Sequence, residues 1–193
     1  MNWQPGQPVR LTTPRFVLRS MTAKDVNRNF LNWQSDPELC IGQNLPIRKA
    51  TRANALRTVE RADNRRSFYL LICASIAEKP IGFFAVRADL SNLAAETTVV
   101  VGDKTFWGKG VVLETRHRLI EFLFDDLRME KVIGKPHARN LSSIFNYKAQ
   151  GFTCEGVLRQ QLRSVADGSR LDQLEFGLLR PEWRPDAKVK TNG

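Results

Sequence analysis

The sequence predicts an α/β protein with one mixed β-sheet and helices on both sides of it. Three observations lead to this fold class. The predicted elements follow the order β-α-α-β-β-β-α-β-α-β-β. A glycine loop at residues 108–110 joins a β-branched strand to a long amphipathic segment, and a further strand follows that segment. Such a strand-helix-strand unit is expected to be right-handed with parallel strands, whereas short turns elsewhere predict antiparallel pairs.

The amino-terminal part predicts a loose arm, a strand and a helix. Three prolines lie within residues 1–14, which disfavours regular structure there, and Phe16–Arg19 is a short strand. Thr22 is a suitable helix N-cap, and Asp25 follows three residues later in the pattern of a capping box. We expect this first helix to continue to about residue 33.

A loop and a second helix are expected next. Asp-Pro at 36–37 ends the first helix, because this dipeptide favours a turn. Gly42 and Pro46 break any regular pattern, so residues 37–47 are expected to be a loop. Residues 51–62 read as a second helix with arginines on its exposed side.

Three strands are predicted for the middle of the chain, at residues 67–74, 81–87 and 95–102. Each is a largely apolar run rich in β-branched or aromatic residues. A turn at residues 78–80 joins the first two strands, which indicates a hairpin.

The second half predicts two helices and three more strands. Residues 111–127 form a long helix with Leu113, Ile120, Phe124 and Leu127 on one apolar stripe. A strand at 131–134 completes the parallel unit. Residues 140–149 form a short helix that ends near Gly151, with Leu141, Phe145 and Ala149 expected on its buried face. Two final strands, 152–163 and 170–179, are joined by an Asp-Gly turn.

The length of 193 residues indicates a single domain over 1–193, with a core at about 10–183, an arm at 1–9 and a polar tail at 184–193. No apolar run approaches the roughly 18–20 residues that span a bilayer, and no secretory signal is visible. The three cysteines are far apart, which favours the reducing cytoplasm over a disulfide framework. With two histidines and no clustered carboxylates, we expect no metal site.

The formal net charge of +10 favours anionic partners: a phosphorylated cofactor, an acidic substrate or nucleic acid. The basic residues are dispersed, however, and no nucleic-acid-binding motif accompanies them, so nucleic acid is the disfavoured choice.

The loop within residues 106–114, Phe-Trp-Gly-Lys-Gly-Val-Val-Leu-Glu, predicts an anion site. Its amides and the first turn of the following helix direct free N–H groups at one spot, where the helix dipole adds partial positive charge. Gly108 and Gly110 permit positive φ and close approach of the backbone to a ligand. The expected ligand is a diphosphate held by main-chain atoms.

This loop and this order of elements resemble the GNAT acetyltransferase superfamily over about residues 10–183. The superfamily's Gln/Arg-x-x-Gly-x-Gly/Ala maps onto Trp107–Val112, with Trp and Val departing from the pattern at its two ends. Further segments resemble the RimJ/RimL-like branch: residues 11–19 match its Leu-x-Thr-x-Arg-Leu-x-Leu-Arg opening, and 140–156 match its Asn-x-x-Ser, Gly-Phe and Glu-Gly series.

The resemblance implies a mostly antiparallel seven-stranded sheet with a central splayed parallel pair, flanked by about four helices. Pro136 supports the splay, because a proline in a fully paired central strand would delete a ladder hydrogen bond. The resemblance also implies transfer of acetyl from acetyl-CoA to a primary amine by direct attack in a ternary complex. The cofactor-binding residues it implies are Val99, Val100, Val101, Trp107, Gly108, Lys109, Gly110, Val111, Val112, Asn140, Ser143 and Tyr147.

Within that set, the amides from Gly108 to Val112 would hold the pyrophosphate, and Lys109 would add charge or be solvated. Backbone N–H groups near Val99 to Val101 would stabilise the oxyanion of the thioester carbonyl.

Tyr147 is the first candidate for the acid that protonates the thiolate, and Ser143 is the second. Both lie on one helical face with Asn140, which is also a suitable helix N-cap. The alternative for Tyr147 is simple packing against the cofactor.

Glu96 and His137 are the candidate bases, the first at the start of a strand and the second near the expected thioester. Each has a structural alternative, as a solvated carboxylate and as a turn residue. His117 lies on the apolar stripe of the long helix and is expected to be structural.

The acceptor stays open among a protein N-terminus, a polyamine, an amino sugar or nucleotide sugar, and an amine-bearing toxin. Trp33 and the 40–46 segment would border its pocket by family analogy. A non-catalytic acyl-CoA sensor or scaffold is the alternative function, and a homodimer is compatible with the resemblance.

Overall fold

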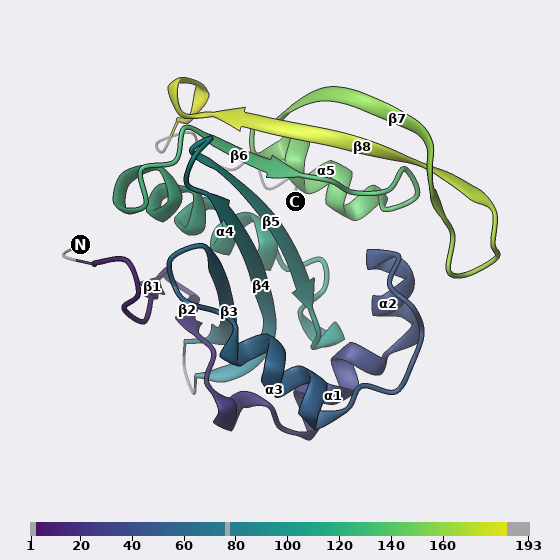
Figure 1. Cartoon of the computed structure of the whole chain (residues 1–193), viewed down its shortest axis with the longest axis horizontal. Helices are drawn as coiled ribbons and strands as arrows, with labels where there is room; N and C mark the ends of the chain where they lie inside the picture. The colour runs from purple at the N-terminus through teal and green to yellow at the C-terminus, as the bar shows by residue number, and fades with distance from the viewer. Residues whose placement is uncertain (1–2, 76–77, 185–193) are drawn as a thin grey trace.

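The computed structural model describes residues 3–75 and 78–184, and Figure 1 shows how its elements are arranged. The strands are β1 (Arg10–Thr12), β2 (Phe16–Ser20), β3 (Ser67–Ala74), β4 (Lys79–Asp89), β5 (Ala94–Val101), β6 (Lys131–Gly134), β7 (Thr153–Arg163) and β8 (Arg170–Leu179). The helices are α1 (Arg28–Ser35), α2 (Pro37–Gln43), α3 (Arg52–Glu60), α4 (Val111–Glu121) and α5 (Leu141–Ala149). A π-helical turn, Phe122–Asp126, extends α4.

The predicted fold class is confirmed. The described strands form one sheet in the order β1-β2-β3-β4-β5-β6-β8-β7, in which β5 and β6 are parallel and the other neighbours are antiparallel. Within residues 3–75 and 78–184 the sheet has eight strands instead of seven, and five α-helices are present instead of about four. The polar tail predicted for 184–193 lies almost wholly outside the described residues.

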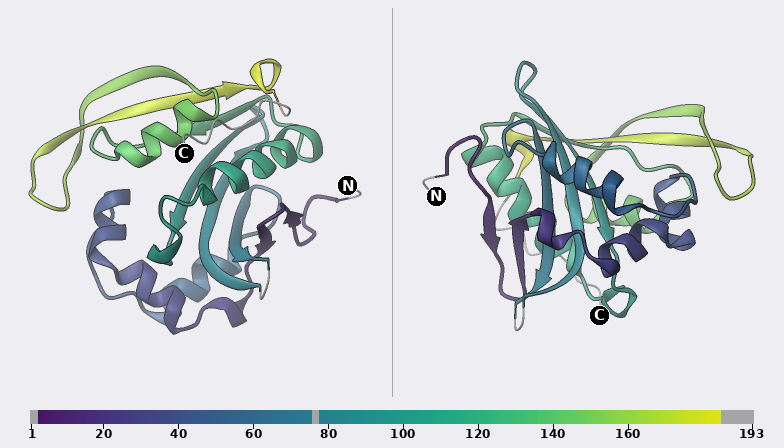
Figure 2. Two further views of the ribbon diagram at one scale, coloured as in Figure 1. Left: turned by 180° about the vertical axis from the view of Figure 1, so that it is seen from behind. Right: turned by 60° about the horizontal axis from the view of Figure 1, so that its bottom comes forward.

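The sheet is covered by helices on both faces, as the two views of Figure 2 show. Successive residues of a strand point to opposite faces, so β3 contributes to two cores. Its Leu70 and Ile72 pack in the cluster that includes α4, whereas Leu71 and Cys73 pack in the cluster that includes α1 and α3.

The loose arm predicted for residues 1–14 is wrong over its described part. Leu11 is fully buried, and β1 pairs with β2. The Trp3 ring packs edge-on against Phe122, with ring centroids 4.9 Å apart. Burial of these apolar side chains outweighs the prolines, which flank the short strand instead of interrupting it.

The single helix predicted for 22–33 is two elements. A 3-10 turn, Ala23–Asp25, comes first, and its Asp25 carboxylate accepts the Thr22 amide at 2.8 Å as the capping box predicts. Asn27 then caps α1, with its side-chain oxygen 3.2 Å from the Phe30 amide.

The loop predicted for 37–47 contains helix α2. Asp36 caps it by accepting the Glu38 and Leu39 amides, and Pro37 occupies the first turn. Proline there loses nothing, since its missing N–H would have no intrahelical partner. The Asp-Pro pair therefore ends one helix and also starts the next, which ends at Asn44 in the left-handed conformation.

The central parallel pair is splayed, as predicted. Pairing of β5 with β6 runs only from Ala94↔Lys131 to Glu96↔Ile133. Beyond that point the two strands diverge, and the main chain of β5 no longer has a neighbouring strand on that side (Figure 1).

The two helices beside the splay follow the prediction to different degrees. The apolar stripe of α4 and its π-turn is buried as expected. On α5, the prediction that Leu141 and Phe145 are core residues is wrong, because their exposed fractions are 73% and 56%. The inward face of this helix carries Tyr147 instead, so apolar character alone gave the wrong face.

The start of β2 is tied to the first turn of α4 through the Glu114 carboxylate. Thr13 Oγ1 and the Arg15 Nε each donate to it at 2.6 Å, and the Arg15 amide donates at 2.9 Å. Burial alone would raise the pKa of Glu114, but these hydrogen bonds outweigh it and lower the pKa. Arg15 Nη1 also donates to the Lys109 carbonyl at 3.0 Å, so the same arginine supports the glycine loop.

We expect Glu114→Gln to lower the unfolding free energy by about 1.5–3 kcal/mol at pH 7, the usual contribution of hydrogen bonds to a charged group. Because folding lowers this pKa, the stabilisation is present above the ordinary carboxyl pKa and disappears as pH falls through the folded value. Urea titrations of both proteins at pH 7 and pH 3 check this. Glu121→Gln, a partly exposed control on the same helix, is expected to cost less. An equal Glu114→Gln effect at both pH values would contradict the assignment.

Candidate active site

The glycine loop has the backbone geometry that an anion site requires. Gly108 and Gly110 have φ of 72° and 71°, a region that other residues rarely adopt. A Cβ at Gly108 would meet nothing within 4 Å, so the glycine leaves an open approach to the backbone. Gly110 is the N-cap of α4.

Free amides are concentrated at the start of α4. The intrahelical bonds begin with the Glu114 amide, which donates to Gly110 O at 3.1 Å. The amides of Val111 and Val112 precede that bond and have no intrahelical acceptor. Among the amides from Gly108 to Val112, which were predicted to hold the pyrophosphate, that of Lys109 already donates within the loop, to Phe106 O at 3.3 Å.

Trp107 ties the loop to the sheet. Its indole Nε1 donates to Val101 O, the last residue of β5, at 2.8 Å. This bond gives a structural role to the residue that departs from the superfamily pattern. The Lys109 ammonium lies over the Phe106 ring, 5.7 Å from its centroid.

Alternate residues of β5 turn their main chain toward the splay. The carbonyls of Thr97, Val99 and Val101 accept bonds from Tyr147, Gln43 and Trp107 on that side. In an antiparallel strand the N–H and C=O of one residue point the same way. The Val99 and Val101 amides therefore face the splay, whereas the Val100 amide faces β4.

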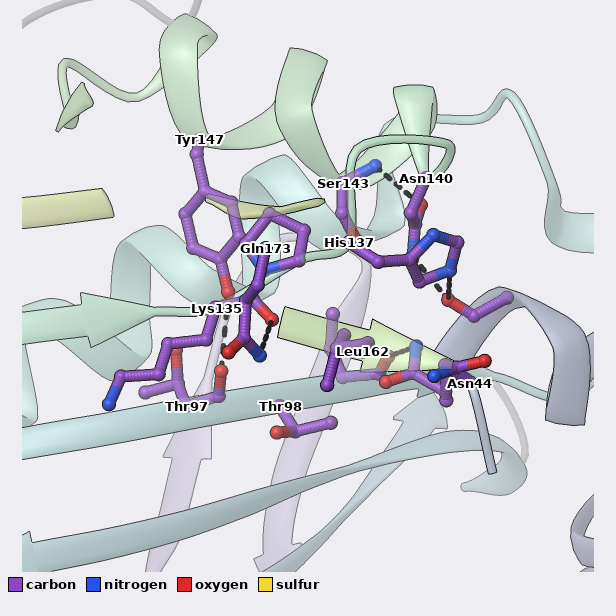
Figure 3. A pocket seen from close by; sticks show the side chains of 14 residues that line it. Asn44, Thr97, Thr98, Lys135, His137, Asn140, Ser143, Tyr147, Leu162 and Gln173 are labelled. Atoms are coloured by element: carbon purple, nitrogen blue, oxygen red, sulfur yellow. Dashed lines mark hydrogen bonds between the residues drawn. The ribbon is translucent and has the colours of Figure 1, made fainter. Parts of the chain in front are cut away.

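A cavity of about 150 Å³ lies where β5 and β6 separate, and Figure 3 shows the side chains around it. Its wall combines four parts of the chain: the end of α2, strand β5, the segment from Lys135 to α5, and the β7–β8 hairpin. The lining residues are Gly42, Gln43, Asn44, Thr97, Thr98, Val99, Lys135, Pro136, His137, Asn140, Ser143, Tyr147, Leu162 and Gln173.

Tyr147 spans the splay from α5 to β5. Its side chain is almost wholly buried, and its hydroxyl donates to Thr97 O at 3.2 Å (Figure 3). The ring is stacked on Phe176 and rests on Gly134 of β6, where an added Cβ would lie 2.0 Å from the ring Cζ. Gly134 is therefore a requirement for this position of the tyrosine, although the sequence interpretation did not select it.

Ser143 and Asn140 line the same cavity as Tyr147. Asn140 is the N-cap of α5, as predicted, since its Oδ1 accepts the Ser143 amide at 3.0 Å. The Asn140 side-chain amide donates to Gly42 O at 2.6 Å.

His137 also binds the Gly42 carbonyl, with its Nε2 at 3.0 Å. A carbonyl only accepts, so the proton of the neutral ring lies on Nε2 and the lone pair lies on Nδ1. The ring is 7% exposed, and its Nδ1 has no hydrogen-bond partner among the described residues. The His137 side chain therefore holds the end of α2 at the cavity wall, and its Nδ1 accepts no hydrogen bond from the described residues.

Glu96 does not join this group. It lines a separate depression of about 610 Å³ beside the β4–β5 hairpin, together with Arg87 and Asp89. Its carboxylate lies 3.7 Å from the ammonium of Lys135, which also lies 3.3 Å from Glu175. Lys135 therefore links Glu96 to the cavity, and the carboxylate itself is not in the cavity wall.

Other parts of the sequence interpretation have mixed outcomes. Within the 40–46 segment, Gly42, Gln43 and Asn44 do line the cavity. Trp33 does not line it and packs on Gly102, where a Cβ would lie 2.2 Å from the indole. His117 is structural, as predicted, beside Glu121 and Trp183.

The sequence interpretation missed Lys135, Leu162 and Gln173, which reach the cavity only through tertiary folding. Gly134 did carry a local signal, because a glycine inside a strand often marks a close approach. Within residues 3–75 and 78–184, no cluster of three or more potential ligands would hold a metal ion. No described helix is long and apolar enough to cross a membrane.

Comparison with known structures shows a shared fold. The spermidine N-acetyltransferase of Vibrio cholerae, solved with CoA and spermine, matches with a TM-score of 0.79 at 15% identity and covers 88% of this chain and 98% of that chain. The ribosomal-protein-S5-alanine acetyltransferase of Vibrio fischeri matches with a TM-score of 0.75 at 18% identity, over 92% of this chain and 100% of that chain.

Comparison of sequences goes further. The uncharacterized N-acetyltransferase p20 of Bacillus licheniformis is 29% identical over 181 residues, which are 90% of this chain and 97% of that protein. The family model of the GNAT acetyltransferase domain matches residues 15–153, a span that contains the glycine loop, both splayed strands and α5. The chain therefore belongs to the GNAT acetyltransferase family.

Proposed function

We propose that this protein transfers acetyl from acetyl-CoA to a primary amine by direct attack in a ternary complex. The observation that carries the proposal is the cavity at the splay. It has the splay-facing Val99 amide on one wall and Tyr147 and Ser143 on the other, and the glycine loop follows the free end of β5. Two proteins that share this fold are an acetyltransferase of spermidine and one of a ribosomal protein.

The groups of the cofactor have matching partners on the chain. The pyrophosphate fits the amides of Gly108, Gly110, Val111 and Val112, where the dipole of α4 adds positive charge. The pantetheine arm fits between β5 and α5, bordered by Asn140 and Ser143. The thioester then lies near Tyr147, and the chain acts as a single acetyltransferase domain.

The reaction follows from these positions. The neutral amine attacks the thioester carbon, and the Val99 amide donates to the oxyanion. The C–S bond breaks, and the Tyr147 hydroxyl turns from the Thr97 carbonyl to give its proton to the departing thiolate. The acceptor nitrogen also loses a proton, and His137 fits the role of base better than Glu96 because its side chain lines the cavity, whereas Glu96 lies in the separate depression beside the β4–β5 hairpin.

The acceptor occupies the part of the cavity that is bordered by Gln43, Asn44 and Leu162. A primary amine on an extended chain, such as a protein N-terminus or a polyamine, suits this position. The RimJ/RimL-like motifs of the sequence favour a protein N-terminus.

We expect the purified protein to bind CoA and acetyl-CoA in calorimetry and to release CoA thiol when an amine is added. The acceptor panel contains peptides with free N-termini, spermidine and glucosamine, and acetylated products are identified by mass spectrometry. Binding without turnover on any amine would support the non-catalytic sensor. Absence of binding to both CoA forms would contradict the cofactor site itself.

Tyr147→Phe is expected to lower kcat about 100-fold, the usual scale for loss of a general acid, with little change in KM for acetyl-CoA. Ser143→Ala is the matched variant on the same helical face and is expected to have a smaller effect. Steady-state rates between pH 6 and 9 measure both. Unchanged turnover in Tyr147→Phe together with slow turnover in Ser143→Ala would assign the acid role to the serine.

Gly134→Ala is expected to lower kcat by at least 10-fold, because its methyl group occupies the space of the Tyr147 ring. Gly156→Ala is the control, since a Cβ there meets nothing within 4 Å. Turnover and thermal unfolding are measured for both variants. A Gly134→Ala protein with wild-type kcat would show that the position of the ring is unimportant.

A further inference from the structure

Arg116 is a buried cation in contact with the proposed acid. It lies on α4, is fully buried, and places its guanidinium carbon 4.2 Å from the centroid of the Tyr147 ring. Its Nη1 donates to Gln150 Oε1 at 3.3 Å, and its Nε has no partner within the described part of the chain. Gln150 is itself fixed by a bond from its Nε2 to Leu113 O at 3.1 Å.

This arginine is costly to the fold. No carboxylate of the described residues forms an ion pair with it, and burial lowers its pKa. Taking a cation out of water without a counter-ion costs several kcal/mol, and a well-packed apolar side chain is often the more stable choice. Leu113 and Ile120 occupy the same inward stripe of α4, so the helical pattern calls for an apolar residue at 116. Departures of this kind concentrate at functional sites.

The contact has a specific electrostatic consequence. A cation over an aromatic ring is attracted by its π electrons, and the attraction grows when the ring carries negative charge. Tyr147 acquires such charge when its O–H bond breaks and the S–H bond of CoA forms. The ring is also stacked on Phe176, with centroids 5.3 Å apart, so its position against the guanidinium is fixed.

We propose that Arg116 is a positioning residue that holds the Tyr147 ring and stabilises the phenolate formed when Tyr147 protonates the departing thiolate. The inference rests on the proposed function, in which Tyr147 is the acid. The phenolate regains a proton from the acceptor side of the cavity before the next turnover, so Arg116 itself exchanges no proton.

The experiment is a double-mutant cycle on kcat. Arg116→Met removes the charge at similar volume, and Arg118→Met is the control, since Arg118 is partly exposed and pairs with Glu121 on the outer side of the same helix. We expect Arg116→Met to lower kcat about 10-fold, between the usual effects of an exposed and a desolvated cation–π contact, with KM for acetyl-CoA unchanged. In a Tyr147→Phe background the same substitution is expected to change kcat less than twofold. Arg118→Met is expected to have no effect in either background.

The Tyr147→Phe background distinguishes this role of Arg116 from a structural one. A merely structural arginine would lower kcat equally in both backgrounds, and that result would overturn the inference. A wild-type kcat in Arg116→Met, with Tyr147→Phe slow, would also overturn it while leaving the proposed acid intact. If Tyr147→Phe itself retained full activity, the acid assignment would fail instead, and this result is separately visible.

Arg116→Lys carries the test if Arg116→Met does not fold. It keeps the charge, and we expect a kcat within about threefold of wild type. An equal loss in the presence and absence of the Tyr147 hydroxyl would overturn the inference. A folded Arg116→Met protein is expected to unfold at a temperature no lower than the wild type, because the buried charge is removed.

Discussion

The interruption of pairing between β5 and β6 is the constraint on which the site depends. Three residue pairs hold the two strands together, and no backbone pairing between β5 and β6 continues beyond Glu96↔Ile133. Main-chain groups of a central strand are normally satisfied by its neighbours. Here the main-chain groups of β5 face side chains and the cavity. Tyr147 and Trp107 each donate a hydrogen bond to one carbonyl that lost its strand partner, and these bonds offset part of the cost of the interrupted pairing.

Local signals predicted much of this architecture. The β-branched run before the loop, the two glycines with positive φ and the buried stripe of α4 are all encoded within a few residues. The capping residues Asn140 and Thr22 were recognisable for the same reason, since a cap acts on amides two or three positions away.

The remaining features depend on contacts between distant segments. Nothing near Leu141 shows that α5 turns its other face inward, and nothing near Arg116 shows that Tyr147 lies against it. Helix α2 was missed because Asp36-Pro37 is a stop signal and a start signal at once. His137 was predicted to lie near the thioester, but its bond to Gly42 joins residues 95 positions apart and has no local signature.

The bond from His137 to Gly42 is one of several that fix the end of α2 in the cavity wall. His137 and Asn140 both donate to the Gly42 carbonyl, and Asn44 bonds to Arg163 O and to the Val165 amide in the β7–β8 hairpin. A seven-residue helix from the first quarter of the chain is thereby fastened to the last third. Insertions or deletions around α2 would reshape this part of the cavity wall while leaving the glycine loop untouched. Under the proposed function, recognition of the amine is therefore free to diversify separately from binding of the acyl donor.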